Sequence, residues 1–135
     1  MAGTKRNSTS AAKRGLSYQT LWQAALQIYQ EPGMQARLIA AQDNAGDNVN
    51  LALLQIYLQR QGHALSEAQL SQLAASLQPF SAQHTGQLRK LRRELLASEA
   101  LDEKSRQQLK EQLLAAELTL EAAEQRLLVD LYNQL

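Results

Sequence analysis

The stretch that decides the fold is Gln42-Asp43-Asn44-Ala45-Gly46-Asp47-Asn48-Val49-Asn50. This polar junction separates two segments whose apolar residues recur at helical spacing. Gly46 favours the end of one helix, because glycine readily adopts a left-handed backbone. Asp47 or Asn48 favours the start of the next, because a short polar side chain accepts hydrogen bonds from free N–H groups. The polar junction therefore predicts a turn between two helices.

The segments on either side of the polar junction carry the apolar residues. Upstream, Ser17 predicts the N-cap of a helix to about Gln30, with Trp22 and Tyr29 in the core, and a second helix runs from near Pro32 to Asn44. The third helix, to about Gln61, is the most apolar segment and is expected at the centre of the fold. Its large apolar residues are Val49, Leu51, Leu53, Leu54, Ile56, Tyr57 and Leu58.

The rest of the chain, residues 62–135, predicts three more helices. Ser66 and Gln69 form a capping-box pattern that opens a short helix, and Pro79-Phe80-Ser81 is expected to end it before a fifth helix begins. A weak break near residues 98–102 precedes a long last helix. We expect that helix to pack through a broad apolar face made of two stripes, Leu109, Leu113, Ala116, Leu120, Ala123, Leu127 and Leu131, and Leu114, Leu118, Leu128, Tyr132 and Leu135.

Length and composition point to one helical domain. The chain has 135 residues, 44% of them hydrophobic but only 4% aromatic, and Ala, Leu, Gln, Glu, Arg and Lys dominate. We predict an all-α, compact bundle of about five to six helices with a long C-terminal helix. Residues 1–15 are expected to be a disordered basic tail, and residues 16–135 a single domain, with a core bundle at 16–98 and the long helix at 102–135.

Several classes of function lack their signatures. The chain has no cysteine, and His63 and His84 have no partner at metal-ligand spacing, so we expect no metal site. No nucleophile elbow or phosphate-binding glycine loop occurs, so we expect no catalytic residue, no cofactor and no enzyme. No apolar run approaches the roughly 20 residues that span a bilayer, and no apolar segment follows the basic N-terminus as in a secretory signal. A cytoplasmic protein without membrane association is the resulting expectation.

The polar junction supplies one group of candidate site residues, Gln42, Asp43, Asp47, Asn48 and Asn50. Such side chains can cap helices, join a buried hydrogen-bond network, or hold a ligand. Under the structural interpretation, Asp47 caps a helix while Gln42 and Asn50 pair with backbone groups. Under the functional one, the side chains converge on an open pocket.

Basic residues supply a second group. These phosphate or nucleic-acid candidates are Arg89, Lys90, Arg92 and Arg93, together with Lys5, Arg6, Lys13 and Arg14 in the N-terminal tail. Arg89, Arg92 and Arg93 share one helix face, which favours phosphate binding. Acidic residues outnumber basic ones after residue 94, however, so the last helix could neutralise this face within the molecule or across a dimer.

Several motifs resemble a family of proteobacterial proteins known only as domain of unknown function 2390. They are Leu21-Trp22 with Tyr29, the Pro32-Gly33 turn, Gln42-Asp43, the stretch from Gly46 to Asn50, and Leu88-Arg89-Lys90-Leu91-Arg92-Arg93. The resemblance covers roughly residues 16–96 and departs from the family pattern where Asn48 replaces an Asp. It implies a helical bacterial cytoplasmic protein and no established activity. Members of the family are often encoded near an ABC-type ATPase that acts on ribosomes, which implies a link to translation.

Three functions remain open from the sequence. The first is a non-enzymatic interaction or regulatory protein with a protein partner, alternatively a homodimer through residues 102–135. The second is an RNA- or ribosome-associated protein that uses the basic tail and residues 89–93. The third is a small-ligand-binding protein or enzyme centred on the polar junction.

Overall fold

The computed structural model describes residues 15–135, which form six α-helices, one π-helical turn and no strand. In chain order the elements are α2 (Tyr18–Tyr29), α3 (Met34–Ala45), α4 (Val49–Arg60), α5 (Glu67–Phe80), η1 (Ser81–Thr85), α6 (Gly86–Ala97) and α7 (Glu103–Asn133). The predicted all-α bundle with a long last helix is confirmed. The predicted tail lies almost entirely in residues 1–14, outside the described range.

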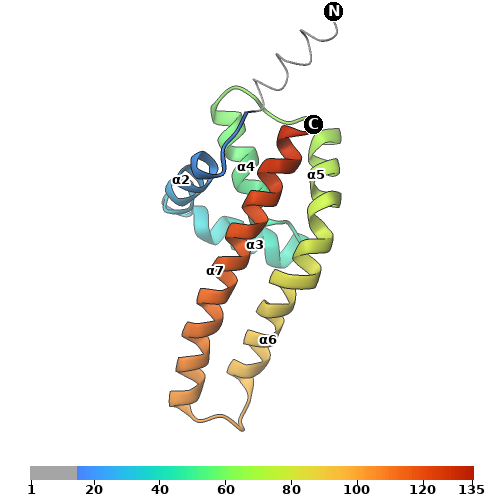
Figure 1. Ribbon diagram of the computed structural model, residues 1–135. Helices are drawn as coiled ribbons and strands as arrows, with labels where there is room; N and C mark the ends of the chain where they lie inside the picture. The colour runs from blue at the N-terminus through green and yellow to red at the C-terminus, as the bar shows by residue number, and fades with distance from the viewer. Residues whose placement is uncertain (1–14) are drawn as a thin grey trace, which may run out of the picture.

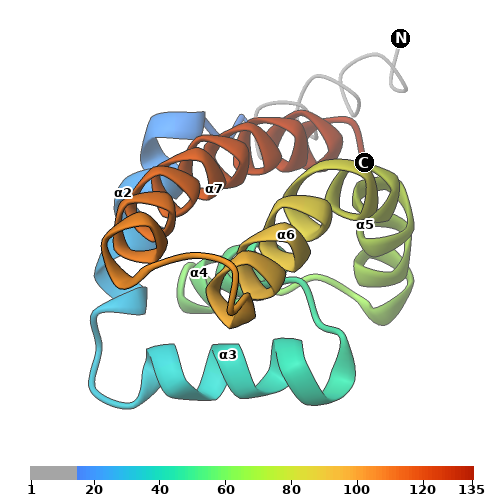
Figure 2. The same cartoon turned by 90° about the horizontal axis from the view of Figure 1, so that it is seen from below.

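The long helix α7 is the axis around which the other helices are arranged (Figure 1). On one side it runs beside α5, η1 and α6, and at its C-terminal half it packs against α2 and α4. α3 packs on α4 and α2 and lies on the side of the molecule opposite α7 (Figure 2). No helix among residues 15–135 is both long and apolar enough to cross a bilayer.

Local sequence signals fix most helix ends. The Ser17 hydroxyl accepts a hydrogen bond from the Thr20 N–H at 3.2 Å, and Ser66 and Gln69 form a complete capping box. Gly46 ends α3 in the left-handed conformation predicted for it. These interactions satisfy N–H and C=O groups that would otherwise lack partners at helix ends.

The predicted break at Pro79-Phe80-Ser81 is wrong. α5 includes Pro79 and continues directly into the π-helical turn η1, which in turn continues into α6. Proline removes one N–H donor and crowds the preceding turn. The chain accommodates this irregularity near the end of α5 with one wider turn, in which hydrogen bonds join residues five positions apart, and the helix continues. As a result, α5, η1 and α6 form one continuous irregular helix beside α7.

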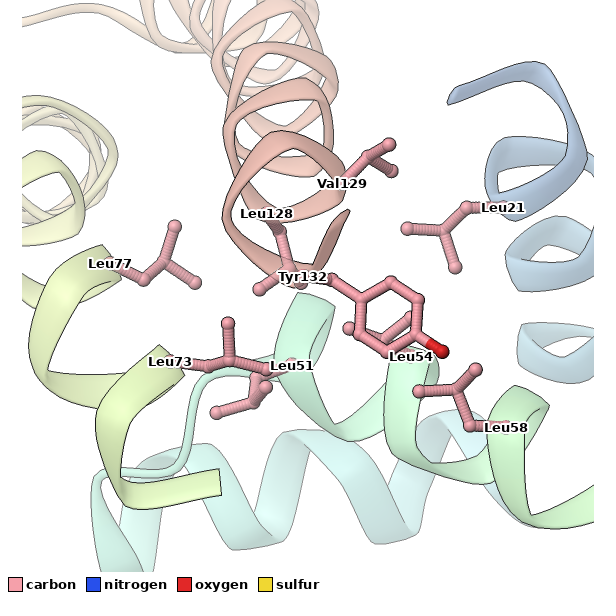
Figure 3. Close-up of a cluster of buried hydrophobic side chains, with 9 residues drawn as sticks. All are labelled: Leu21, Leu51, Leu54, Leu58, Leu73, Leu77, Leu128, Val129 and Tyr132. Atoms are coloured by element: carbon pink, nitrogen blue, oxygen red, sulfur yellow. The ribbon is translucent and has the colours of Figure 1, made fainter. Parts of the chain in front are cut away.

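The main core lies where α2, α4, α5 and the end of α7 meet (Figure 3). Its buried side chains are Leu21, Leu51, Leu54, Leu58, Leu73, Leu77, Leu128, Val129 and Tyr132. A second cluster joins α2, α3 and α4 through Ala25, Ile28, Met34, Leu38 and Leu53. The predicted central position of α4 is therefore confirmed, because it contributes to both clusters.

The predicted apolar face of α7 is only partly right. Leu128 and Tyr132 are buried as expected, but Leu114 and Leu118 are 42% and 52% exposed. Further toward the N-terminus, α7 instead buries Glu117, Glu124 and Gln125. Apolar periodicity cannot predict such a face, because these polar side chains are accommodated by hydrogen-bonding partners that other helices supply.

Candidate binding cleft

Glu124 of α7 is the centre of a buried polar cluster, and only 1% of the residue is exposed. One carboxylate oxygen, Oε1, accepts hydrogen bonds from the amides of Asn48 at 2.7 Å and Asn50 at 3.4 Å. The other, Oε2, accepts one from the Thr85 hydroxyl at 2.5 Å. No ion pair joins Glu124 to a basic side chain within residues 15–135. Neutral donors alone therefore hold this buried carboxylate.

The cluster extends to Ser81 and Gln125. The Asn48 amide also donates to the Ser81 hydroxyl at 3.0 Å, and the Gln125 amide donates to Asn50 Oδ1 at 3.1 Å. The Gln125 side-chain oxygen, Oε1, is buried without a hydrogen-bond partner among residues 15–135. An unsatisfied buried acceptor costs free energy and is uncommon in folded proteins, so this atom is a candidate to accept a hydrogen bond from a ligand.

The polar junction positions the first half of this cluster. Asn48 is the N-cap of α4, and its Oδ1 accepts a hydrogen bond from the Leu51 N–H at 3.0 Å while its amide group reaches Glu124. Asp47 is exposed and does not cap the helix. Within the described part of the chain, the Asn50 side chain pairs with side chains of α7 and not with backbone groups. Of the two predicted caps, Asn48 is confirmed and Asp47 is wrong. The expectation that Asn50 binds backbone groups is also wrong, because α7 packs against the start of α4 and supplies side-chain partners.

The π-helical turn positions the second half. Ser81 and Thr85 are its first and last residues. The Ser81 hydroxyl accepts a hydrogen bond from Asn48, and the Thr85 hydroxyl donates one to Glu124. Gly86 follows, and a Cβ atom there would lie 2.9 Å from the Ser81 carbonyl oxygen. Such π-helical turns often occur at functional sites. The irregular turn thus places two hydroxyl groups on one carboxylate-centred cluster.

Arginines of α6 and glutamates of α7 form the next layer. Arg92 holds Glu117 through two hydrogen bonds of 2.6 and 3.1 Å. Arg89 donates to Glu121 at 3.3 Å and lies 3.8 Å from Glu117. The hydrogen bonds to Glu117 raise the pKa of Arg92, and burial raises the pKa of Glu121 against the lowering effect of Arg89. The acidic residues of the last helix therefore do pair with the basic face within the molecule.

The remaining candidates lie at the edge. Arg93 of α6 and Asp43 of α3 approach to 4.0 Å, but both side chains are more than half exposed. Gln42 and Asp47 line the same cleft, whereas Lys90 lies outside it, beside a shallower depression. Lys5, Arg6, Lys13 and Arg14 lie outside the described residues. The structure thus brings the polar junction and the basic face together, which the sequence treated as separate sites.

Apart from Thr85, the residues of the Glu124 cluster line one open cleft of about 980 Å³ between the helices, together with the ion-paired residues of α6 and α7. Trp22 and Tyr29, expected in the core, are only partly buried and line it as well. Burial raises the pKa of Tyr29. Five large apolar side chains are exposed among residues 15–135, and four of them, Leu26, Ile39, Leu114 and Leu118, line this cleft. The cleft is therefore lined by exposed apolar side chains, which form its apolar wall, and by the ion pairs of α6 and α7, which form its ionic wall. The polar cluster around Glu124 forms its floor.

Sequence reasoning missed the contributions of α5, η1 and α7. Glu117, Glu121 and Glu124 follow one another at spacings of four and three, so they share a helix face, and this signal could have found them. Ser81, Thr85 and Gln125 had no comparable signal.

Among the described residues, no group of three His, Asp or Glu side chains could hold a metal ion. His84 packs edge-on against Phe80 at 4.7 Å between ring centres.

The fold and the cleft define an all-helical bundle protein with an amphipathic cleft lined by several helices. A family model matches residues 20–128, and the chain belongs to that family, described as protein of unknown function (DUF2390). The family resemblance seen in the sequence is thereby confirmed. No curated protein and no solved structure matches the chain.

Proposed function

We propose that this protein is a non-enzymatic binding protein and that the cleft receives an amphipathic segment of a protein partner. The observation that carries the proposal is the position of the exposed apolar residues, four of which gather in the cleft beside the charged groups of α6 and α7. Exposed apolar side chains rimmed by polar groups are typical of interaction sites.

The composition of the walls favours a helical segment as the occupant. An amphipathic helix buries an apolar stripe and presents polar side chains beside it, and grooves between helices commonly bind such segments. Leu114 and Leu118 are one helical turn apart on α7, and Leu26 and Ile39 come from α2 and α3. Apolar side chains on the segment would cover these residues, and its polar side chains would meet the ionic wall.

The ion pairs weigh against RNA as the first partner. Arg89 and Arg92 are held by Glu117 and Glu121, so a phosphate would have to displace carboxylates from them. Within the cleft, Arg93 is the most exposed of the three arginines, with 64% of its side chain exposed. An RNA-bound protein remains the alternative outcome of the experiment below.

A second copy of the chain is another candidate occupant. Leu114 and Leu118 lie within the segment 102–135 through which a homodimer was expected. We keep the proposal of a cytoplasmic setting for either kind of partner, which the cysteine-free sequence favours.

The test is affinity capture from a lysate of the source organism with three baits: wild type, Leu118→Arg and Leu91→Arg. Leu118 lies in the cleft, and Leu91 is a matched control because it is comparably exposed but lies outside the cleft. We expect a protein that wild type and Leu91→Arg capture and Leu118→Arg does not, with or without RNase.

Three results would overturn the proposal. Equal capture by both variants would remove the cleft from the interaction. Loss of all captured proteins on RNase treatment would favour RNA. Captured material consisting only of the bait itself, with a dimeric sedimentation coefficient lost in Leu118→Arg, would favour the homodimer.

A further inference from the structure

The floor of the cleft has an excess of hydrogen-bond acceptors. Glu124 is a buried carboxylate without a basic partner among the described residues, and Gln125 Oε1 is a buried oxygen without a donor. Gln125 itself is only 3% exposed. Both residues line the cleft, and the Asn50 amide links them by hydrogen bonds to each. The two acceptors therefore belong to one site.

We propose that this floor binds a primary ammonium group on an apolar chain, the side chain of a lysine in the bound partner segment. An ammonium group carries three N–H donors and one positive charge. The floor offers the Glu124 carboxylate, the free Gln125 Oε1 and the second lone pair of Asn50 Oδ1. A hydrogen bond between a charged donor and a carboxylate is roughly twice as strong as one between neutral groups, so an ammonium group matches this site better than a neutral donor.

The existing hydrogen bonds select ammonium over guanidinium. An arginine binds a carboxylate best through two parallel bonds, one to each oxygen. Thr85 already occupies Glu124 Oε2 with a bond of 2.5 Å. On Oε1 the bond from Asn50 is the long one, 3.4 Å against 2.7 Å from Asn48. A single-point donor can therefore replace or join the Asn50 bond without disturbing Thr85.

The cleft walls account for the apolar chain. A lysine side chain carries four methylene groups, which pack along apolar surface while the charge reaches a polar site. Ala25, Val49 and Ala52 line the cleft together with the floor residues. This inference rests on the proposed function, since it takes the cleft to be the binding site.

The probe is hexylammonium, with hexanol as a neutral match and hexanoate as an anionic one. Binding to the full chain is followed by the side-chain amide NMR signals of Asn48, Asn50 and Gln125. We expect hexylammonium to bind at least about tenfold more tightly than hexanol, since a hydrogen bond to a charged group accounts for about that factor. Hexanoate should bind more weakly than hexanol.

Glu124→Gln is the decisive variant, and Glu111→Gln is its control, because Glu111 is an exposed residue of the same helix outside the cleft. Glu124→Gln should lose most of the preference for hexylammonium over hexanol, and Glu111→Gln should keep it. If Glu124→Gln does not fold, the wild-type comparison of the three probes decides alone.

Equal binding of hexylammonium and hexanol to wild type would overturn the inference. So would an unchanged preference in a folded Glu124→Gln variant. In either case, hexanol binding that shifts signals of cleft residues would leave the cleft as a binding site, so the two proposals can fail separately.

Discussion

Two neighbouring stretches of α7 are buried in opposite ways. Leu128, Val129 and Tyr132 enter an apolar core, whereas Glu117, Glu124 and Gln125 enter polar surroundings. The apolar stretch needs only burial, which is favourable wherever it occurs. The polar stretch is tolerable only where other helices provide specific partners. The C-terminal end of α7 therefore holds the fold together, and we propose that its middle part serves binding.

The apolar end should show the largest loss of stability. Leu128→Ala removes a fully buried side chain and should lower the free energy of unfolding by about 2–5 kcal/mol. Leu118→Ala, on the same helix but 52% exposed, should change it by less than about 0.5 kcal/mol. Urea denaturation of both variants measures the difference. Similar losses would contradict the assignment of the core to this end.

Removing a hydrogen-bond donor from the polar stretch should also lower the stability of the protein. Thr85→Val keeps the shape of the side chain but removes the hydroxyl bond to Glu124, and should cost about 1.5–3 kcal/mol, as for hydrogen bonds to charged groups. Thr119→Val is the control, because its hydroxyl bonds only an exposed backbone carbonyl of its own helix. Equal costs in thermal unfolding would mean that the Glu124 cluster contributes nothing specific.

The π-helical turn in the continuous helix beside α7 offers a sharper test of the same cluster. Alanine usually stabilises a helix relative to glycine, yet Gly86→Ala places a Cβ atom 2.9 Å from the Ser81 carbonyl. We therefore expect a net loss of about 1–2 kcal/mol, the usual cost of overpacking. Gln87→Ala at the next, exposed position should be nearly neutral in the same denaturation assay. A stabilised Gly86→Ala variant would contradict the close approach at the π-helical turn.

The smallest effect concerns the pH dependence of Glu121. Burial raises its pKa above the ordinary value of 4.5, so the folded protein binds this proton more tightly than the unfolded chain. Stability from this group is present below the unfolded pKa and is lost as pH rises through the folded pKa. Because 37% of the side chain is exposed, the effect should stay below about 1 kcal/mol.

Glu121→Gln isolates this contribution. The free energy of unfolding of the variant minus that of wild type should be larger at about pH 7 than at about pH 4. The reason is that the variant lacks the charge that burial disfavours. Glu111→Gln, an exposed change on the same helix, should show no such trend. A difference that runs in the opposite direction would mean that the ion pair with Arg89 outweighs burial.

Local signals were sufficient for the helical class and for several helix ends. Ser17, Ser66 with Gln69, and Gly46 act within a few residues of themselves, so the sequence predicts the helix ends that they set. Pro79 misled the prediction, because the cost of a proline depends on whether the surrounding chain can form a wider turn.

The cleft was much harder to predict. Asn48 and Asn50 were found as candidates, but their partner Glu124 lies 76 and 74 positions away, and no local pattern links them. The polar junction and the basic face also looked like separate sites. Their shared cleft results from tertiary packing of α4 and α6 against α7 and of α3 against α4, which periodicity does not encode.

Methyl NMR of the protein with its captured partner tests the central claim most directly. We expect the largest shifts at Leu26, Ile39, Leu114 and Leu118 in the cleft, with little change at Leu91 on the outer side of α6 and at Leu128 in the core. Shifts confined to Leu91 and its neighbours, with the cleft methyl groups unchanged, would contradict the claim that the cleft is the binding site.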